Sequence, residues 1–484
     1  MKKSRLASNI GYNITYQVLV LIIPLITAPY ISRTLNVDGL GTFSYVSSVA
    51  YYFFILISLG LNNYGNRTIA KCGEDRSLRS LKFWSIYGMQ ISLGVLVTFC
   101  YIIYTLIFAD DSLKSYFAVY TIYVVSAAID INWFFFGIQQ FKLTTTRNAI
   151  VKILSLSLIF IFVKGKNALT YYMLIVAGST LLSNIILWVQ LRKYVSFYRP
   201  KVVEIITHIK PNLVLFIPIL AMSIYRVMDK IMIKELSGVT QNGYYENADR
   251  IISISLTVFS AVATVMMPAI STMVAEGKSE SIKRFLRDKI QITSSLSVAM
   301  TFGLIAISRQ FAPLFFGEQY GETGILLIGL APTIFLSGWK NVLRSQYLIP
   351  YEKDKAYVIS LVSGAIVNVL MNAIFIPKLG ARGAVIGTIC AEFTGFMIQT
   401  YVVNKNFGVL VLARDAALFI PSGFIMGLFV YMIINYLPSS LFSIAITIVL
   451  GAIIYFALTL LIMRAIVPKR LYYYRQLLHN RIRG

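Results

Sequence analysis

The sequence contains few of the residues from which soluble enzymes build their sites. Only 13% of its 484 residues are charged, against about 25% in an ordinary soluble protein. Three cysteines, Cys72, Cys100 and Cys390, exclude a disulfide-stabilised secreted scaffold. Two histidines, His208 and His479, argue against a zinc enzyme and against a Ser/His/Asp triad. No Gly-rich loop of the Walker type occurs, so the chain does not itself hydrolyse nucleotides.

Apolar residues dominate instead. They make up 57% of the chain, enough for about 14 helices of roughly 20 residues each, the length that crosses a bilayer. The sequence therefore predicts an all-α integral membrane protein. The expected spans lie near residues 10–32, 42–63, 83–108, 115–137, 147–163, 169–191, 213–233, 250–274, 289–308, 324–346, 356–376, 384–403, 416–436 and 440–463.

The ionisable residues are mostly basic. There are 44 Lys and Arg against 20 Asp and Glu, for a formal net charge of +24. If the N-terminus is cytoplasmic, about 31 of the basic residues fall in inner segments and about 9 in outer loops. This bias predicts an even number of spans with both termini in the cytoplasm. Orientation and contact with anionic membrane lipids account for most of the charge, so nucleic acid is not an expected partner.

The longest polar connection, residues 192–212, separates the chain into two similar halves. It carries a short apolar face, which fits either an interfacial helix or an ordinary linker. A faint repeat supports the division, because Gly41–Tyr45 and Gly243–Asn247 each follow a Pro-containing span. We therefore predict an N-lobe of six spans at 1–195, a C-lobe of six spans at 196–407 with an interfacial linker at 196–212, and two further spans with a basic cytoplasmic tail at 408–484.

Ionisable side chains inside the spans point to a function. Each costs at least about 2.5–3.5 kcal/mol at the bilayer centre, so it must face protein or water. The set contains more cations than acids, and several amides accompany it. The cations are Arg147, Lys152, Arg226, Lys230, Arg250, Lys340 and Arg344, the acids are Asp130, Asp229, Glu246, Asp249 and Glu392, and the amides are Asn341, Gln346, Asn368 and Asn372. A cavity lined by them would favour a polyanion, because a low dielectric strengthens Coulomb attraction and Arg and Lys suit phosphate.

Simpler explanations remain open for most of this set. They are membrane-interface positions for Arg147, Arg250 and Arg344, a local pair of Asp229 with Lys230, a partner role of Asp130 for Arg147 or Lys152, and interhelical packing by Asn368 and Asn372. Lys152 and Lys340 are harder to explain in this way, because apolar sequence flanks each on both sides.

Several short motifs also occur in a particular order along the spans. They are Pro24–Arg33 followed by Gly39-Leu-Gly41, Gly60–Arg67, Asp130–Trp133 with Gly137 and Arg147-Asn148, Tyr225 with Asp229-Lys230, Gln346–Pro350, and Asn368 and Asn372 followed by Ile376-Pro377 and Gly383-Ala384. With these motifs the chain resembles, over almost its whole length, the Wzx-type polysaccharide repeat-unit flippases. That family belongs to the multidrug/oligosaccharidyl-lipid/polysaccharide exporter superfamily.

The resemblance implies a transporter and not an enzyme. Such a protein moves undecaprenyl-diphosphate-linked oligosaccharide from the inner to the outer leaflet of the bacterial cytoplasmic membrane, by alternating access of two lobes. The implied partners are the lipid-linked glycan, membrane lipids, and a polymerase with other assembly proteins. No cofactor or metal is expected, and an H⁺ or Na⁺ gradient is the implied energy source.

The site residues that follow from this interpretation fall into three groups. Substrate binding is assigned to Arg33, Arg147, Lys152, Arg226, Lys230, Lys340, Arg344 and Trp133, ion coupling or charge pairing to Asp130, Asp229 and Glu392, and polar lining of the cavity to Asn341, Gln346, Asn368 and Asn372.

Three other functions stay open. A lipid II flippase shares the expected fold and a cationic cavity. A drug/cation antiporter would need an acidic cavity, and acidic residues are scarce here. A membrane glycosyltransferase or a polymerase would need a soluble domain with an acidic metal-binding motif or a large outer loop, and the sequence has room for neither.

Overall fold

The computed structural model describes residues 2–276, 279–408, 413–414 and 416–466. Within these residues the regular structure is helical, with no β-strand, which confirms the predicted all-α class. Each predicted apolar run falls on a helix or on two adjoining helices. His479 and the end of the predicted basic tail, from residue 467 onward, lie outside the described residues.

The predicted number of fourteen spans is not confirmed. In the part of the chain that the structure describes, eleven helices are long and apolar enough to cross a bilayer. The number rises to twelve if Glu318–Leu330 and Pro332–Leu348, which meet at a 45° bend, form one span. One cause lies at the N-terminus, where α1 (Lys2–Ser58) is one stretch made of two helices, which hold the first predicted span and most of the second. A kink at Asn36, where φ is 60°, separates them without a loop.

The chain divides into two compact units between Glu246 and Asn247. The helices of the first unit are α1, α2 (Leu61–Ala70), α3 (Arg76–Ile107), α4 (Lys114–Ala128), α5 (Asn132–Gly137), α6 (Phe141–Phe162), α7 (Leu169–Leu191), α8 (Val202–Ile206), α9 (Ile209–Ser237) and the start of α10 (Val239–Ala275). α9 packs against α1 and α2, and α8 packs against α3, which places them in this unit. The predicted lobe boundaries at residues 195 and 407 stay a prediction.

A short helix, α8, lies in the predicted linker. The Glu204 carboxylate accepts a hydrogen bond from the Lys201 backbone N–H at 2.8 Å, which caps the start of this helix. Val202 and Val203 are 69% and 72% exposed. Apolar side chains on the open face of a short helix favour the interfacial interpretation over an ordinary linker.

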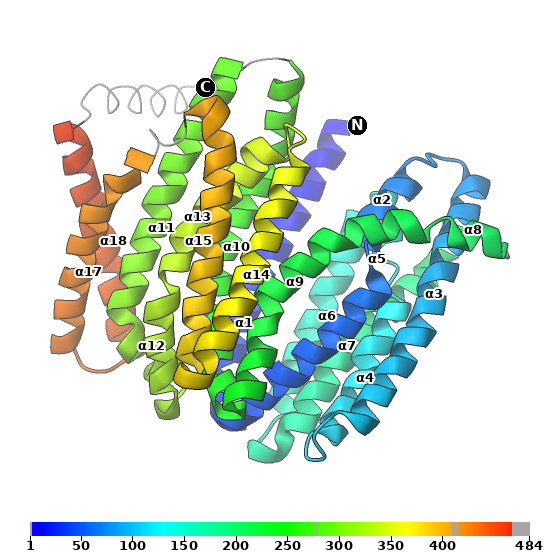
Figure 1. The fold of residues 1–484 in the computed structure, drawn as a ribbon, viewed down its shortest axis with the longest axis horizontal. Coiled ribbons are helices and arrows are strands. Elements are labelled where there is room, and N and C mark those ends of the chain that lie inside the picture. The colour runs from blue at the N-terminus through cyan, green and yellow to red at the C-terminus, as the bar shows by residue number, and fades with distance from the viewer. Residues whose placement is uncertain (1, 277–278, 409–412, 415, 467–484) are drawn as a thin grey trace. The chain divides into compact units, whose positions relative to one another are not determined.

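The helices α3, α5 and α7 belong to the first unit (Figure 1), and aromatic rings fill the core between them. Phe83 of α3 stacks on Trp133 of α5 with ring centroids 5.6 Å apart. Gly65 of α2 lies against the same indole, and a Cβ at this position would come within 2.5 Å of the ring. Glycine therefore allows α2 to pack directly on Trp133.

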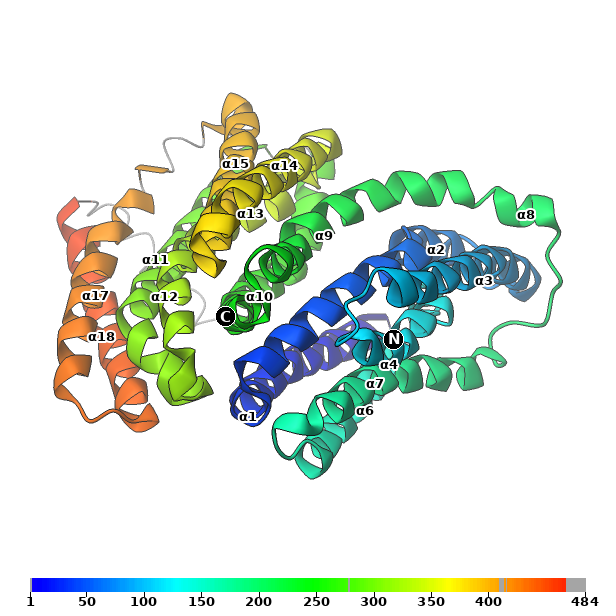
Figure 2. The ribbon, with the colours of Figure 1, turned by 60° about the horizontal axis from the view of Figure 1, so that its bottom comes forward.

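The helices of the second unit are the rest of α10, α11 (Ser279–Phe316), α12 (Gly321–Leu330), α13 (Pro332–Leu343), α14 (Asp354–Leu379), α15 (Ala381–Phe407), α17 (Phe419–Tyr436) and α18 (Leu441–Ile466). A π-helical turn, Arg344–Leu348, continues α13. α14 and α15 form a closely packed pair, and α17 and α18 lie beside α11 (Figure 2).

The two repeated segments noted in the sequence cross each other inside the first unit. Thr240 donates a hydrogen bond to Asp38 at 2.6 Å, and Ser44 donates one to Glu246 at 2.8 Å; both pairs are 202 residues apart. A Cβ on Gly41 would lie 2.1 Å from the Val239 carbonyl oxygen, and one on Gly243 would lie 2.1 Å from the Val37 carbonyl oxygen. Equivalent residues thus exchange equivalent contacts, so the crossing of α1 and α10 has local two-fold symmetry.

Candidate functional site

A polar cavity of about 350 Å³ lies in the first unit, where the break between α4 and α5 faces α6 and α7. Three of the predicted residues, Asp130, Arg147 and Lys152, lie on its wall. Amide and hydroxyl side chains from neighbouring helices complete the lining, among them Asn132, Asn148, Ser183 and Asn184. Because the wall carries two cations and one acid, the cavity attracts anions.

Asp130 lies where the chain interrupts its helical path. α4 ends at Ala128 and α5 begins at Asn132. The Asp130 carboxylate accepts hydrogen bonds from the Asn132 backbone N–H at 2.9 Å and from the Asn132 Nδ2 at 2.6 Å. The acid therefore supplies the partner that the first backbone N–H of the new helix lacks.

Three residues that the sequence did not single out satisfy the carbonyl groups freed by this break. Gln90 Nε2 donates to the carbonyl oxygens of Ala127 and Asp130, both at 2.8 Å. Asn184 Nδ2 bonds the Ser126 carbonyl at 2.8 Å, and Trp188 Nε1 bonds the Ile129 carbonyl at 2.8 Å. Irregular backbone at membrane depth needs such partners. The signal that could have identified Gln90 and Asn184 is an amide within an apolar run.

Arg147 is buried, at 5% exposure, and donates hydrogen bonds to Ser183, Asn132 and Asn148. Nη1 donates to the Ser183 carbonyl at 2.8 Å, while Nη2 donates to Asn132 Oδ1 at 2.8 Å and to Asn148 Oδ1 at 2.6 Å. A chain of hydrogen bonds through Asn132 therefore links Arg147 to Asp130. Arg147 is a buried member of the cavity wall that ties α6 to α5 and α7.

Lys152 is half-buried and follows Arg147 by five residues on α6. It lines the same cavity as Arg147 and Asp130. The structure therefore brings these three predicted residues together.

Trp133 does not lie in this site. It is 1% exposed, its Nε1 donates to Gln90 Oε1 at 3.0 Å, and its ring packs on Gly65 and Phe83. The indole is thus enclosed by core side chains, and a contact of Trp133 with substrate stays a prediction. Its neighbour Asn132 carries the polar function of this motif.

In the second unit, Lys340 and Glu392 form an ion pair. Lys340 Nζ lies 2.7 Å from Glu392 Oε2, which also accepts a hydrogen bond from Ser337 Oγ at 2.5 Å. Both charged side chains are largely buried. Arg344 donates to the Tyr357 hydroxyl at 3.4 Å and lies over that ring.

The four predicted amides also belong to the second unit. Asn368 and Asn372 are fully buried in the contact of α14 with α15. A Cβ on Gly387 would lie 2.1 Å from Asn372 Oδ1, so a glycine makes room for this amide. The placement of this pair favours interhelical packing. Gln346 is buried in the π-helical turn, and Asn341 is half-buried in α13.

The remaining predicted residues lie elsewhere in the first unit. Lys230 forms an ion pair with Glu246 at 2.8 Å, and the buried Asp229 accepts a hydrogen bond from Tyr245 at 2.7 Å. Each thus pairs with the start of α10. Arg33 and Arg226 are exposed. That all of these residues line a single cavity stays a prediction.

Comparisons with known proteins match this chain in sequence and in fold. The family model described as "Polysaccharide biosynthesis protein" matches residues 6–274, and the model described as "Lipid II flippase MurJ" matches residues 236–455. A protein of Escherichia coli (strain K12) described as "Putative O-antigen transporter" is 22% identical over 83% of this chain and 98% of its own length.

Solved structures establish the fold independently. A lipid II flippase MurJ in an inward closed conformation has a TM-score of 0.72 with 14% identity, over 94% of this chain and 98% of that chain. A multidrug resistance MATE family transporter in an inward-facing conformation has a TM-score of 0.57 with 15% identity, over 81% of this chain and 99% of that chain. At such identities these likenesses concern the fold alone.

The matched relatives are named as transporters and flippases, which confirms the prediction of a transporter and not an enzyme. The first family model covers more than half of the chain. The chain is therefore a multi-pass membrane transporter that belongs to the polysaccharide biosynthesis protein family.

Proposed function

We propose that the protein is a flippase that carries undecaprenyl-diphosphate-linked oligosaccharide repeat units across the bacterial cytoplasmic membrane by alternating access. The observation that carries this proposal is the cation-rich cavity among apolar helices, with Arg147 and Lys152 on its wall. A diphosphate is the concentrated negative charge of such a substrate, and its attraction to Lys and Arg is strengthened where water is excluded. The naming of the E. coli relative for O-antigen supports the choice of a glycan cargo.

The two cations have different roles in this proposal. Lys152, a flexible ammonium on the wall, contacts the phosphate directly. Arg147 holds α5, α6 and α7 together through Asn132, Asn148 and Ser183, and adds positive potential. The lipid chain stays in the bilayer while the head group crosses.

Ion coupling is assigned to the acids Asp130 and Glu392. Glu392 is the sharper candidate, because its carboxylate is shared by Lys340 at 2.7 Å and Ser337 at 2.5 Å. An H⁺ or Na⁺ that bound this carboxylate would compete with Lys340. Binding of the ion would thus loosen the contact between α13 and α15.

The cellular setting follows from the same proposal. Both termini lie in the cytoplasm, as the distribution of basic residues predicts. The undecaprenyl-diphosphate-linked glycan and membrane lipids are the direct partners, and a polymerase with other assembly proteins uses the product.

Complementation tests the function. In a bacterial strain that lacks its own repeat-unit flippase and supplies the matching glycan, the protein should restore surface polymer. Lys152→Ala should abolish this at a normal protein level, whereas Lys164→Ala, at an exposed position outside the cavity, should not. Intact polymer assembly with Lys152→Ala, at a normal protein level, would refute the cavity assignment.

A lipid II flippase is the second candidate. It is favoured by the match of residues 236–455 to the MurJ family model. Rescue of growth in a strain depleted of its lipid II flippase, without rescue of polymer in the strain above, would select it.

A further inference from the structure

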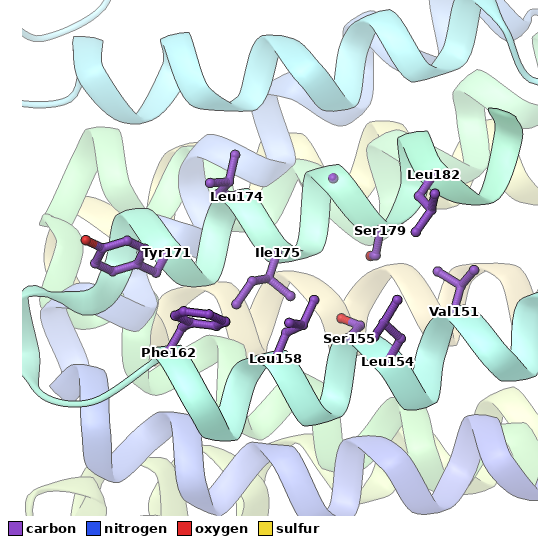
Figure 3. A pocket seen from close by; sticks show the side chains of 11 residues that line it. Val151, Leu154, Ser155, Leu158, Phe162, Tyr171, Leu174, Ile175, Ser179 and Leu182 are labelled. Carbon is purple, nitrogen blue, oxygen red and sulfur yellow. The ribbon is translucent and has the colours of Figure 1, made fainter.

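An apolar groove runs along α6 and α7, next to the polar cavity. Its volume is about 390 Å³, and its lining is almost entirely hydrocarbon, with Leu154, Leu158, Phe162, Leu174 and Ile175 among the side chains. Figure 3 shows Val151, Ser179 and Leu182 at one end and Phe162 and Tyr171 at the other. Val151 and Phe162 are eleven residues apart on α6, which corresponds to about 16 Å along the helix.

The groove is continuous with the cavity. Val151 and Ser179 line both, and Lys152 follows Val151 directly. One end of the apolar groove therefore opens onto the cavity wall, which carries two cations and one acid. Such a surface matches a ligand with an anionic head and a hydrocarbon chain.

Gly178 keeps the groove open. It lies on α7 among the lining residues, and a Cβ placed on it would meet no atom within 4 Å. Any larger residue there would project into open space, and replacing a helical glycine carries no cost in helix propensity. The position therefore offers a way to fill the groove without disturbing the packing around it.

We propose that the groove and the cavity together form a binding site for a prenyl phosphate lipid, with the phosphate at Lys152, in the positive potential of Arg147, and the first part of the chain along α6 and α7. The inference rests on the proposed function and names where the lipid part of its substrate is held. A single hydrocarbon chain fits a groove between two helices, whereas a bilayer phospholipid carries two such chains.

The predicted orientation agrees with loading from the inner leaflet. The distribution of basic residues places the start of α6 on the cytoplasmic side. Arg147 lies six residues after Phe141, the first residue of α6, or about 9 Å along the axis. Lys152 lies eleven residues after Phe141, or about 16 Å along the axis, so a phosphate bound to it lies near the middle of the bilayer. The groove runs from this depth toward Phe162, the last residue of α6, so the head group lies on the cytoplasmic side of the chain.

Binding of undecaprenyl phosphate to the purified full-length protein in detergent micelles tests the proposal. Gly178→Phe should fill the groove and Lys152→Gln should remove a cation, so each should weaken binding at least about tenfold, or 1.4 kcal/mol. Ile150→Phe is the matched control, because Ile150 is 60% exposed on α6 and lines neither the groove nor the cavity. It should bind as the unchanged protein does, and all three variants should keep its melting temperature.

Competition identifies the ligand class. Inorganic pyrophosphate and phosphatidylglycerol should each displace undecaprenyl phosphate poorly. Full displacement of undecaprenyl phosphate by pyrophosphate would show that the groove does not contribute to binding. Phosphatidylglycerol that bound as tightly as undecaprenyl phosphate would show that the groove is an ordinary lipid contact. Unchanged binding by a well-folded Gly178→Phe would overturn the site and leave the flippase intact. Failure of the unchanged protein in the complementation assay would overturn the proposed function, whatever lipid the groove binds.

Discussion

At the scale of single residues, the polar groups of the first unit have two roles. Gln90, Asn184 and Trp188 repair the break between α4 and α5, while Lys152 stays on the cavity wall. Arg147 does both, because it lines the cavity and bonds three neighbours. Substitution of a residue that bonds the break between α4 and α5 should therefore lower stability, whereas substitution of a residue that contacts the substrate should lower transport.

Gln90→Leu should destabilise the protein before it affects specificity. It would leave the carbonyls of Ala127 and Asp130 and the Trp133 Nε1 without their present partner, at about 1–3 kcal/mol for each buried group. The measurement is thermal unfolding in detergent, where the midpoint should fall clearly. Gln190→Leu, a half-buried position on α7, is the control. Equal melting of the two variants would contradict this account of the helix break.

At the scale of secondary-structure elements, the close crossing of α1 and α10 depends on two glycines. Gly41 and Gly243 each face a carbonyl oxygen of the other helix at a distance that no side chain could occupy. Small residues allow such backbone approach between membrane helices. Around the crossing, Lys234 also pairs with Asp110 at 2.6 Å, and the Tyr45 hydroxyl donates to Glu235 at 2.5 Å.

Gly41→Ala and Gly243→Ala should each force the two helices apart. Overpacking of this kind costs about 1–3 kcal/mol, so we expect a lower melting temperature and faster hydrogen exchange at Val37–Tyr45. Gly178→Ala is the control, because open space surrounds that glycine. Since the crossing is symmetric, the two variants should behave alike. A large effect from only one of them would argue against the symmetry.

At the scale of the whole molecule, most of the +24 charge should determine how the chain is inserted and oriented in the membrane, and should not take part in transport. Lys283 and Arg284 are exposed and lie in a predicted inner loop. Replacing both with Gln should lower the amount of correctly inserted protein, because the bias that orients the chain is weakened. Lys152→Gln should instead abolish transport at unchanged abundance. Membrane fractionation with the complementation assay measures both, and transport loss without loss of inserted protein in the loop variant would contradict this division.

Much of this protein could be read before its fold was known. A low content of charge and long apolar runs predict membrane helices, because only such segments are stable in a bilayer. The excess of cations within the spans predicts an anionic cargo, because buried positive charge attracts negative charge. This prediction does not depend on how the helices are arranged. The residues Asp130, Arg147 and Lys152 were found in this way, and the structure places them on one cavity wall.

The packing of the helices decided which side chains contact each other, and residue spacing along the sequence could not predict this. Spacing along a helix assigns a side chain to a face, but the partner on that face depends on how distant segments meet. Glu392 pairs with Lys340, Asn132 links Asp130 to Arg147, and the kink at Asn36 lets one expected span follow the other without a loop. Trp133 is buried because Gly65, far along the chain, leaves room for its ring. Local sequence carries no record of such contacts between remote residues.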